Sequence, residues 1–164
     1  MSALRDEFCK SIKARYPVIS AKADAEYQRL WDDFEGEHYS YSWFEALANA
    51  LNKEMNKKVS VTEHQELLAV IGSSFESGDE AIRQCIEVAF VENLFWQVTP
   101  LEFMTAYWSA LPENLKELYI AFHGRGPLEQ FRREGRFASC ACKYPPPLRG
   151  SGRPSRQTLA CKKP

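Results

Sequence analysis

Apolar residues recur every three or four positions throughout residues 1–123, and no segment of this stretch alternates with period two. This spacing places the apolar side chains on one face of a helix, so it predicts amphipathic helices and no sheet. The expected helices span about 2–15, 21–34, 42–56, 63–77, 80–96, 101–111 and 112–123. Because short loops join them, we expect an all-α, compact bundle of about seven helices, packed as antiparallel helical hairpins.

Several residues predict where these helices begin and end. Pro17 is expected to stop the first helix, and Gly124 the last. Thr62 and Thr99 are each followed three residues later by Gln or Glu, which is the form of a capping box, and Asp79 is a third candidate cap. The helix that follows Asp79 is apolar around much of its circumference, which predicts burial at the centre of the domain.

The formal net charge of −1 hides a strong asymmetry along the chain. Residues 1–123 carry 11 Lys and Arg against 20 Asp and Glu, whereas residues 124–164 carry 10 Lys and Arg against only 2 acidic residues. We therefore divide the chain into an acidic helical domain, 1–124, and a basic extension, 125–164. Within the extension, 128–137 favours a short helix, and the Pro, Gly and Arg residues beyond it predict a flexible tail.

The length of 164 residues suits one compact domain with a tail. No apolar run approaches the roughly 18 residues of a membrane helix, and charges interrupt the N-terminal stretch where a secretory signal would be apolar. Among the 5 cysteines, Cys9 and Cys85 lie far apart in predicted helices, which argues against a disulfide scaffold. We therefore predict a cytoplasmic protein with no membrane partner.

The sequence contains no constellation typical of catalysis or metal binding. His38, His64 and His123 are scattered and form no helical two-histidine pair for zinc. Glycine-rich phosphate loops and nucleophile elbows are absent, and the closely spaced Cys140 and Cys142 lack the further ligands of a metal site. We therefore expect no catalytic site, no metal and no cofactor, and predict that the protein is not an enzyme.

The candidate binding surface is an acidic loop followed by aromatic residues. Carboxylates there can steer a basic partner, and tyrosines can anchor a protein–protein contact. The predicted partner-binding residues are Asp32, Asp33, Glu35, Glu37, Tyr39 and Tyr41, with Glu76, Asp79 and Glu80 as a second acidic cluster. The alternatives are a solvated loop before a helix that buries Trp43 and Phe44, and simple helix capping by the second cluster. Trp96 and Trp108 lie on apolar stripes and are predicted to be core residues.

Two segments carry a family resemblance: GDEAIRQCIEVAFVENLFWQVTP at 78–100 and LPENLKELYIAFHG at 111–124. They resemble small helical bacterial proteins that are encoded beside Rhs-type polymorphic toxin genes, and the resemblance covers roughly residues 20–124. It implies an immunity protein, which binds the toxin domain encoded alongside it and so protects the producing cell. The shared positions are mostly core positions, and the resemblance brings no catalytic residues with it.

Together these features predict an immunity protein that occludes a cognate antibacterial toxin domain through an acidic surface. The toxin domain is expected to be basic, because toxins that act on nucleic acids or nucleotide cofactors present positive charge to phosphate.

Two other functions fit the sequence. One is an adaptor or regulator whose basic tail binds nucleic acid or an acidic partner. Nucleic acid is not the expected partner, because the acidic body would repel a polyanion, and docking of the tail on that body explains its charge equally well. The other is a small enzyme, which would need a polar pocket that joins Glu87, Glu92, His64 or His123 in space.

Overall fold

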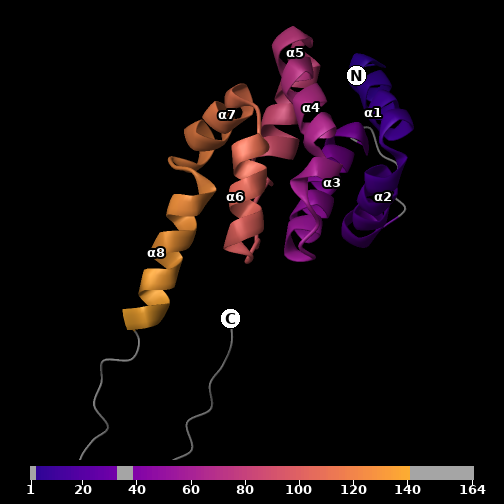
Figure 1. Cartoon of the computed structure of the whole chain (residues 1–164). Coiled ribbons are helices and arrows are strands. Elements are labelled where there is room, and N and C mark those ends of the chain that lie inside the picture. The colour runs from indigo at the N-terminus through magenta and orange to yellow at the C-terminus, as the bar shows by residue number, and fades with distance from the viewer. Residues whose placement is uncertain (1–2, 33–38, 141–164) are drawn as a thin grey trace, which may run out of the picture.

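The computed structural model describes residues 3–32 and 39–140, with side chains as far as Arg133. It confirms the all-α prediction, since the described residues form helices and turns without strands (Figure 1). The α-helices are α1 (Ala3–Arg15), α2 (Pro17–Trp31), α3 (Tyr39–Asn56), α4 (Gln65–Ser77), α5 (Glu80–Gln84), α6 (Leu101–Ala110), α7 (Glu113–His123) and α8 (Pro127–Cys140). Two shorter elements are the 3₁₀ helix η1 (Val61–Glu63) and the π-helix η2 (Cys85–Val91). None of the described helices combines the length and the apolar character that crossing a membrane requires.

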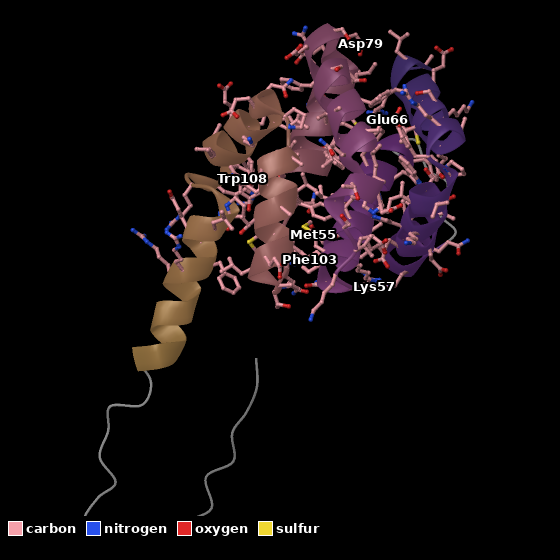
Figure 2. The ribbon with its side chains drawn as sticks, viewed as in Figure 1. Met55, Lys57, Glu66, Asp79, Phe103 and Trp108 are labelled. Atoms are coloured by element: carbon pink, nitrogen blue, oxygen red, sulfur yellow. The ribbon has the colours of Figure 1, made fainter. Side chains whose placement is uncertain are left out.

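Helix α3 is the element around which the others pack. It contacts α1, α2, η2 and α6, and it lies between the α1–α2 pair and α6 in Figure 1. Its fully buried apolar side chains include Trp43, Phe44, Leu47, Leu51 and Met55. Met55 lies between α3 and α6 (Figure 2). Because these residues recur with helical spacing, one face of a single helix supplies the centre of the core.

Some helix boundaries agree with the sequence signals, and others differ. Asp79 caps α5, since its carboxylate accepts the N–H of Ile82 at 2.9 Å, and Gly124 ends α7 with a φ of 76°, both as predicted. Pro17 does not simply end the first helix, because it is also the first residue of α2. A proline at this position loses nothing, since the first N–H groups of a helix have no partner within it. Helix α2 therefore begins earlier than predicted.

Neither predicted capping box forms. At the first, Ser60 rather than Thr62 is the cap, and its hydroxyl accepts the N–H of Thr62 at the start of η1. At the second, the N–H and the hydroxyl of Thr99 both donate to Oδ1 of Asn56 on α3. Thr99 is therefore bonded to a residue distant in sequence, Asn56, and does not cap the helix that follows it.

The helix predicted over 80–96 changes geometry along its length. Helix α5 passes into the π-helix η2 at Cys85, and turns occupy residues 92–97. The predicted burial is observed in η2, where Ile86 and Phe90 are fully buried. The chain nevertheless leaves the helix before Trp96, and this departure shapes the surface described below.

Helix α8 corresponds to the short helix predicted in the basic extension. It packs on α6 and then extends away from the rest of the bundle (Figure 1). Residues 141–164, and with them the predicted flexible tail, lie outside the described residues.

We expect Leu47→Ala to lower the free energy of unfolding by about 2–5 kcal/mol, because Leu47 is fully buried and its truncation leaves a cavity beside α3. Leu101→Ala is the matched control, since this leucine is 44% exposed, and its cost should stay below about 1 kcal/mol. Chemical denaturation measures both values. Similar losses in the two variants would contradict the central position of α3.

Candidate partner-binding cleft

The acidic loop predicted as the binding surface lies largely outside the described residues, which include neither Asp33, Glu35 nor Glu37. Asp32 is exposed directly after α2. Tyr39 and Tyr41, at the start of α3, are partly buried against the core.

These two tyrosines make contacts within the fold. Nζ of Lys13 donates to the Tyr39 hydroxyl at 2.6 Å, and the Tyr39 ring meets Tyr27 edge-on at a centroid distance of 4.8 Å. Burial raises the pKa of Tyr41. Tyr39 thus joins α1, α2 and α3, Tyr41 packs on the core, and a role of the loop in partner binding stays a prediction.

Glu76, Asp79 and Glu80 lie close in sequence around the turn between α4 and α5. Asp79 is the cap of α5, and a carboxylate oxygen of Glu76 lies 3.3 Å from the Asn114 amide nitrogen, which donates to it. Figure 2 places Asp79 at the opposite end of the bundle from Lys57, which follows α3. The Asp79 contact fits the capping alternative, Glu76 instead contacts Asn114 of α7, and a partner-binding role for this cluster stays a prediction.

A cleft of about 520 Å³ opens where α2, α3, α7 and the turns after η2 meet. We call it the α3 cleft, because α3 contributes a polar stripe to its lining. The polar stripe consists of Glu45, Asn49, Asn52 and Asn56. Spacings of four, three and four residues put these side chains on one face of the helix. Trp96 and Phe122, both exposed aromatic residues, also line the cleft.

Two asparagines of the polar stripe hold the turns after η2 against α3. The Asn52 amide donates to the carbonyl of Asn93 at 2.8 Å and accepts the buried N–H of Phe95 at 2.7 Å. The Asn56 amide donates to the carbonyl of Gln97 at 3.1 Å, and its oxygen accepts the N–H of Thr99 as described above. We call these contacts the asparagine clamp.

The clamped turns contain backbone strain. Phe95 has a φ of 64° and Gln97 a φ of 54°, which are left-handed values that residues other than glycine seldom adopt. Such strain persists only where surrounding contacts impose it, and it is concentrated at functional sites. The π-helix η2 directly precedes these turns, and π-helical segments are also frequent at functional sites.

The strained turns place two consecutive aromatic side chains in different environments. Phe95 points into the core, where its ring meets Trp108 and Tyr119 edge-on. Trp96, the next residue, is 65% exposed. The prediction that Trp96 is a core residue is therefore wrong, because the helix that would have turned it inward ends before it.

The cations of the α3 cleft are engaged by one carboxylate. Glu26 of α2 accepts hydrogen bonds from Arg29, at 3.0 Å, and from Lys53 of α3. Burial acts to raise the pKa of Glu26, but these two cations hold it below its ordinary value of 4.5.

Glu45 and Glu92 carry the remaining negative charge of the cleft. Burial raises the pKa of Glu45, and the nearby carboxylate of Glu92 raises it further. Neither carboxylate has an ion pair with a cation among residues 3–32 and 39–133. This end of the cleft therefore favours a positively charged guest.

The α3 cleft joins Glu92 with His123, one of the combinations that an enzyme would need. Nε2 of His123, however, lies 3.1 Å from the backbone oxygen of Glu92, and the ring stacks 4.2 Å from Tyr119. This nitrogen is engaged with the backbone rather than presented to a substrate. In the described part of the chain, no three His, Cys, Asp or Glu side chains are grouped so that they could hold a metal ion.

A second hollow, of about 610 Å³, lies between the start of α2, the end of α3 and the start of α4. His64 in its wall is 6% exposed, and its Nε2 has no hydrogen-bond partner among the described residues. Oε2 of Glu54 lies 3.7 Å away and is paired with Lys22. Burial lowers the pKa of His64 below its ordinary value of 6.5, although Glu54 acts in the opposite direction.

The polar stripe was not predicted from the sequence, although a signal for it was present. Asn49, Asn52 and Asn56 have the spacing of an apolar stripe but are polar, and they share α3 with the core residues. A polar stripe on a helix that is otherwise mostly buried indicates that its side chains bind something other than the core.

The family described as "Domain of unknown function (DUF7674)" matches residues 9–124. The chain belongs to this family. The match begins within α1 and ends directly after α7, so every residue that lines the α3 cleft lies inside the DUF7674 domain. No curated protein and no solved structure matches the chain.

We expect Asn52→Ala to lower the free energy of unfolding of the DUF7674 domain by at least about 2 kcal/mol. The substitution leaves the buried N–H of Phe95 and the carbonyl of Asn93 without partners. Asn49→Ala is the matched control on the same stripe, and its cost should stay below about 0.5 kcal/mol. Equal losses in urea denaturation would show that the asparagine clamp does not form.

A second prediction concerns pH. Because burial lowers the pKa of His64, the unfolded chain takes up this proton at a higher pH than the folded chain does. The free energy of unfolding should therefore fall as the pH drops below 6.5, until the folded protein is itself protonated. His64→Gln removes this titration beside Glu54 and Lys22, so its stability should depend less on pH. Denaturation curves with the same pH dependence in both proteins would refute the assignment.

Proposed function

We propose that this chain is a cytoplasmic immunity protein, which binds a cognate antibacterial toxin domain of basic character and neutralises it by occlusion. The observation that carries the proposal is the α3 cleft, where Glu45 and Glu92 have no cation partner among the described residues and which the exposed Trp96 also lines. A protein surface that joins negative charge to an aromatic side chain on a fixed backbone suits a basic protein partner.

The charge of the whole body supports the same partner. Residues 1–123 carry 20 acidic against 11 basic residues, so their field would accelerate association with a positively charged domain. The resemblance to proteins encoded beside polymorphic toxin genes supplies the biological setting. In that setting the bundle covers the toxin's active surface, and no bond is made or broken.

Trp96 is the best candidate for the central anchor of such an interface. Tryptophan is enriched among the residues whose truncation weakens protein complexes most, and Trp96 shares the cleft with a second exposed aromatic residue, Phe122. The asparagine clamp fixes the backbone on both sides of Trp96, so little conformational freedom is lost on binding.

Trp96→Ala should raise the dissociation constant for the toxin domain encoded beside this chain by about 30-fold or more, the effect of losing a central aromatic anchor. The free energy of unfolding should change little, because Trp96 is exposed. Calorimetric titration of the toxin domain measures the first quantity, and urea denaturation the second.

Trp31→Ala is the matched comparison, because Trp31 is also exposed but lies next to the acidic loop that begins at Asp32. An effect confined to Trp96→Ala supports the α3 cleft as the interface. An effect confined to Trp31→Ala would transfer the interface to the loop. A toxin domain that binds neither the parent chain nor its variants would overturn the immunity function itself.

A further inference from the structure

Three polar side chains of the α3 cleft have no hydrogen-bond or ion-pair partner in the described part of the chain. Asn52 and Asn56 are used by the asparagine clamp, but Asn49, between Glu45 and Asn52 on the polar stripe, makes no hydrogen bond to the described residues. Glu45 and Glu92 likewise have no cation partner there. A half-buried amide and two carboxylates therefore face the same cavity with their bonding capacity unused.

We propose that the α3 cleft receives an extended segment of the partner protein that carries one cationic side chain, for which arginine fits best. Glu45 and Glu92 bind the cation, Asn49 pairs with the peptide backbone, and Trp96 covers the segment. This inference rests on the proposed function and names the part of the partner that enters the cleft.

The amide of Asn49 points to a peptide. An asparagine side chain presents one carbonyl acceptor and N–H donors side by side, which matches the donor and acceptor of a peptide unit. The polar stripe spans 45–56, which corresponds to about 16 Å along a helix. An extended chain covers that length with about five residues, so the cleft suits a short strand rather than a whole helix.

The two carboxylates point to the charge of the guest. Two unpaired carboxylates in one half-buried site repel each other, and a bound cation removes that repulsion. The cleft's own cations, Arg29 and Lys53, are already engaged by Glu26. A planar guanidinium can bond both carboxylates at once and stack on the indole of Trp96, which an ammonium group does less well.

The test uses two pentapeptides that differ only in charge: acetyl-Ala-Ala-Arg-Ala-Ala-amide and the same peptide with the neutral isostere citrulline in place of arginine. Each is titrated into the isotopically labelled full-length chain, and the NMR signals of the Trp96 indole N–H and the Asn49 side-chain amide are followed. Both signals should shift, and the arginine peptide should bind at least tenfold more tightly.

Two variants assign the parts of the site. Glu45→Gln combined with Glu92→Gln should bring the two peptide affinities within twofold of each other, because only the charge contact is lost. Asn49→Ala should weaken both peptides by similar factors, because they share a backbone. Glu102→Gln, at an exposed carboxylate on α6, is the control and should change neither affinity.

Several outcomes would overturn the inference. Equal affinity of the parent chain for the two peptides, shifts confined to residues outside the cleft, or undiminished discrimination in the double glutamine variant would each do so. The toxin titration separates this failure from failure of the proposed function. A toxin that binds through Trp96 without any response to the arginine peptide leaves the immunity function standing and removes only the peptide insertion. A normal peptide response without toxin binding removes the immunity function, and the cleft then serves another basic protein.

Discussion

Four backbone groups in residues 93–99, the carbonyls of Asn93 and Gln97 and the N–H groups of Phe95 and Thr99, depend on side chains of α3 for their hydrogen bonds. After η2 the chain leaves the helix, so its N–H and C=O groups lose the regular partners that a continuing helix would supply. Asn52 and Asn56 replace those partners, and each satisfies both a donor and an acceptor. Asparagine is suited to this task because its short amide offers both functions in one plane, whereas aspartate would only accept. The position of Phe95 in the core and of Trp96 outside it both follow from this arrangement.

Helix α3 thereby couples the core to the α3 cleft. Its apolar face buries Trp43 and Leu47, and its polar stripe holds the strained turns and lines the cavity. A site built on a helix that is fixed by the core keeps its geometry better than a site on a loop. The left-handed backbone of Phe95 and Gln97 costs free energy, and the clamp and the packing of Phe95 offset that cost. Strain on both sides of a large exposed side chain, here Trp96, is typical of a place where function opposes stability.

The sequence predicted what depends on neighbouring residues and missed what depends on distant ones. Periodicity found α3, α4 and α7, because one buried face imposes a local pattern. Pro17 was ambiguous, since proline both stops one helix and suits the first position of the next. Thr99 and Trp96 were misassigned because their places are decided by Asn56 and Asn52, more than forty residues earlier in the chain. The cleft could not be predicted from the sequence for the same reason, because its carboxylates, Glu45 on α3 and Glu92 after η2, come together only in the folded chain.

The fold also suggests separate physical roles for the exposed and the half-buried carboxylates. Exposed charges are screened within about 8 Å at physiological salt, so the acidic residues spread over the body influence mainly the rate of encounter with a basic partner. Glu45 is half-buried, and its attraction to a bound cation is screened much less. On the proposed function, the exposed Asp32 acts in the first of these roles. Residence of the partner would then depend on the cleft, because the rate of dissociation is governed by contacts from which water has been removed.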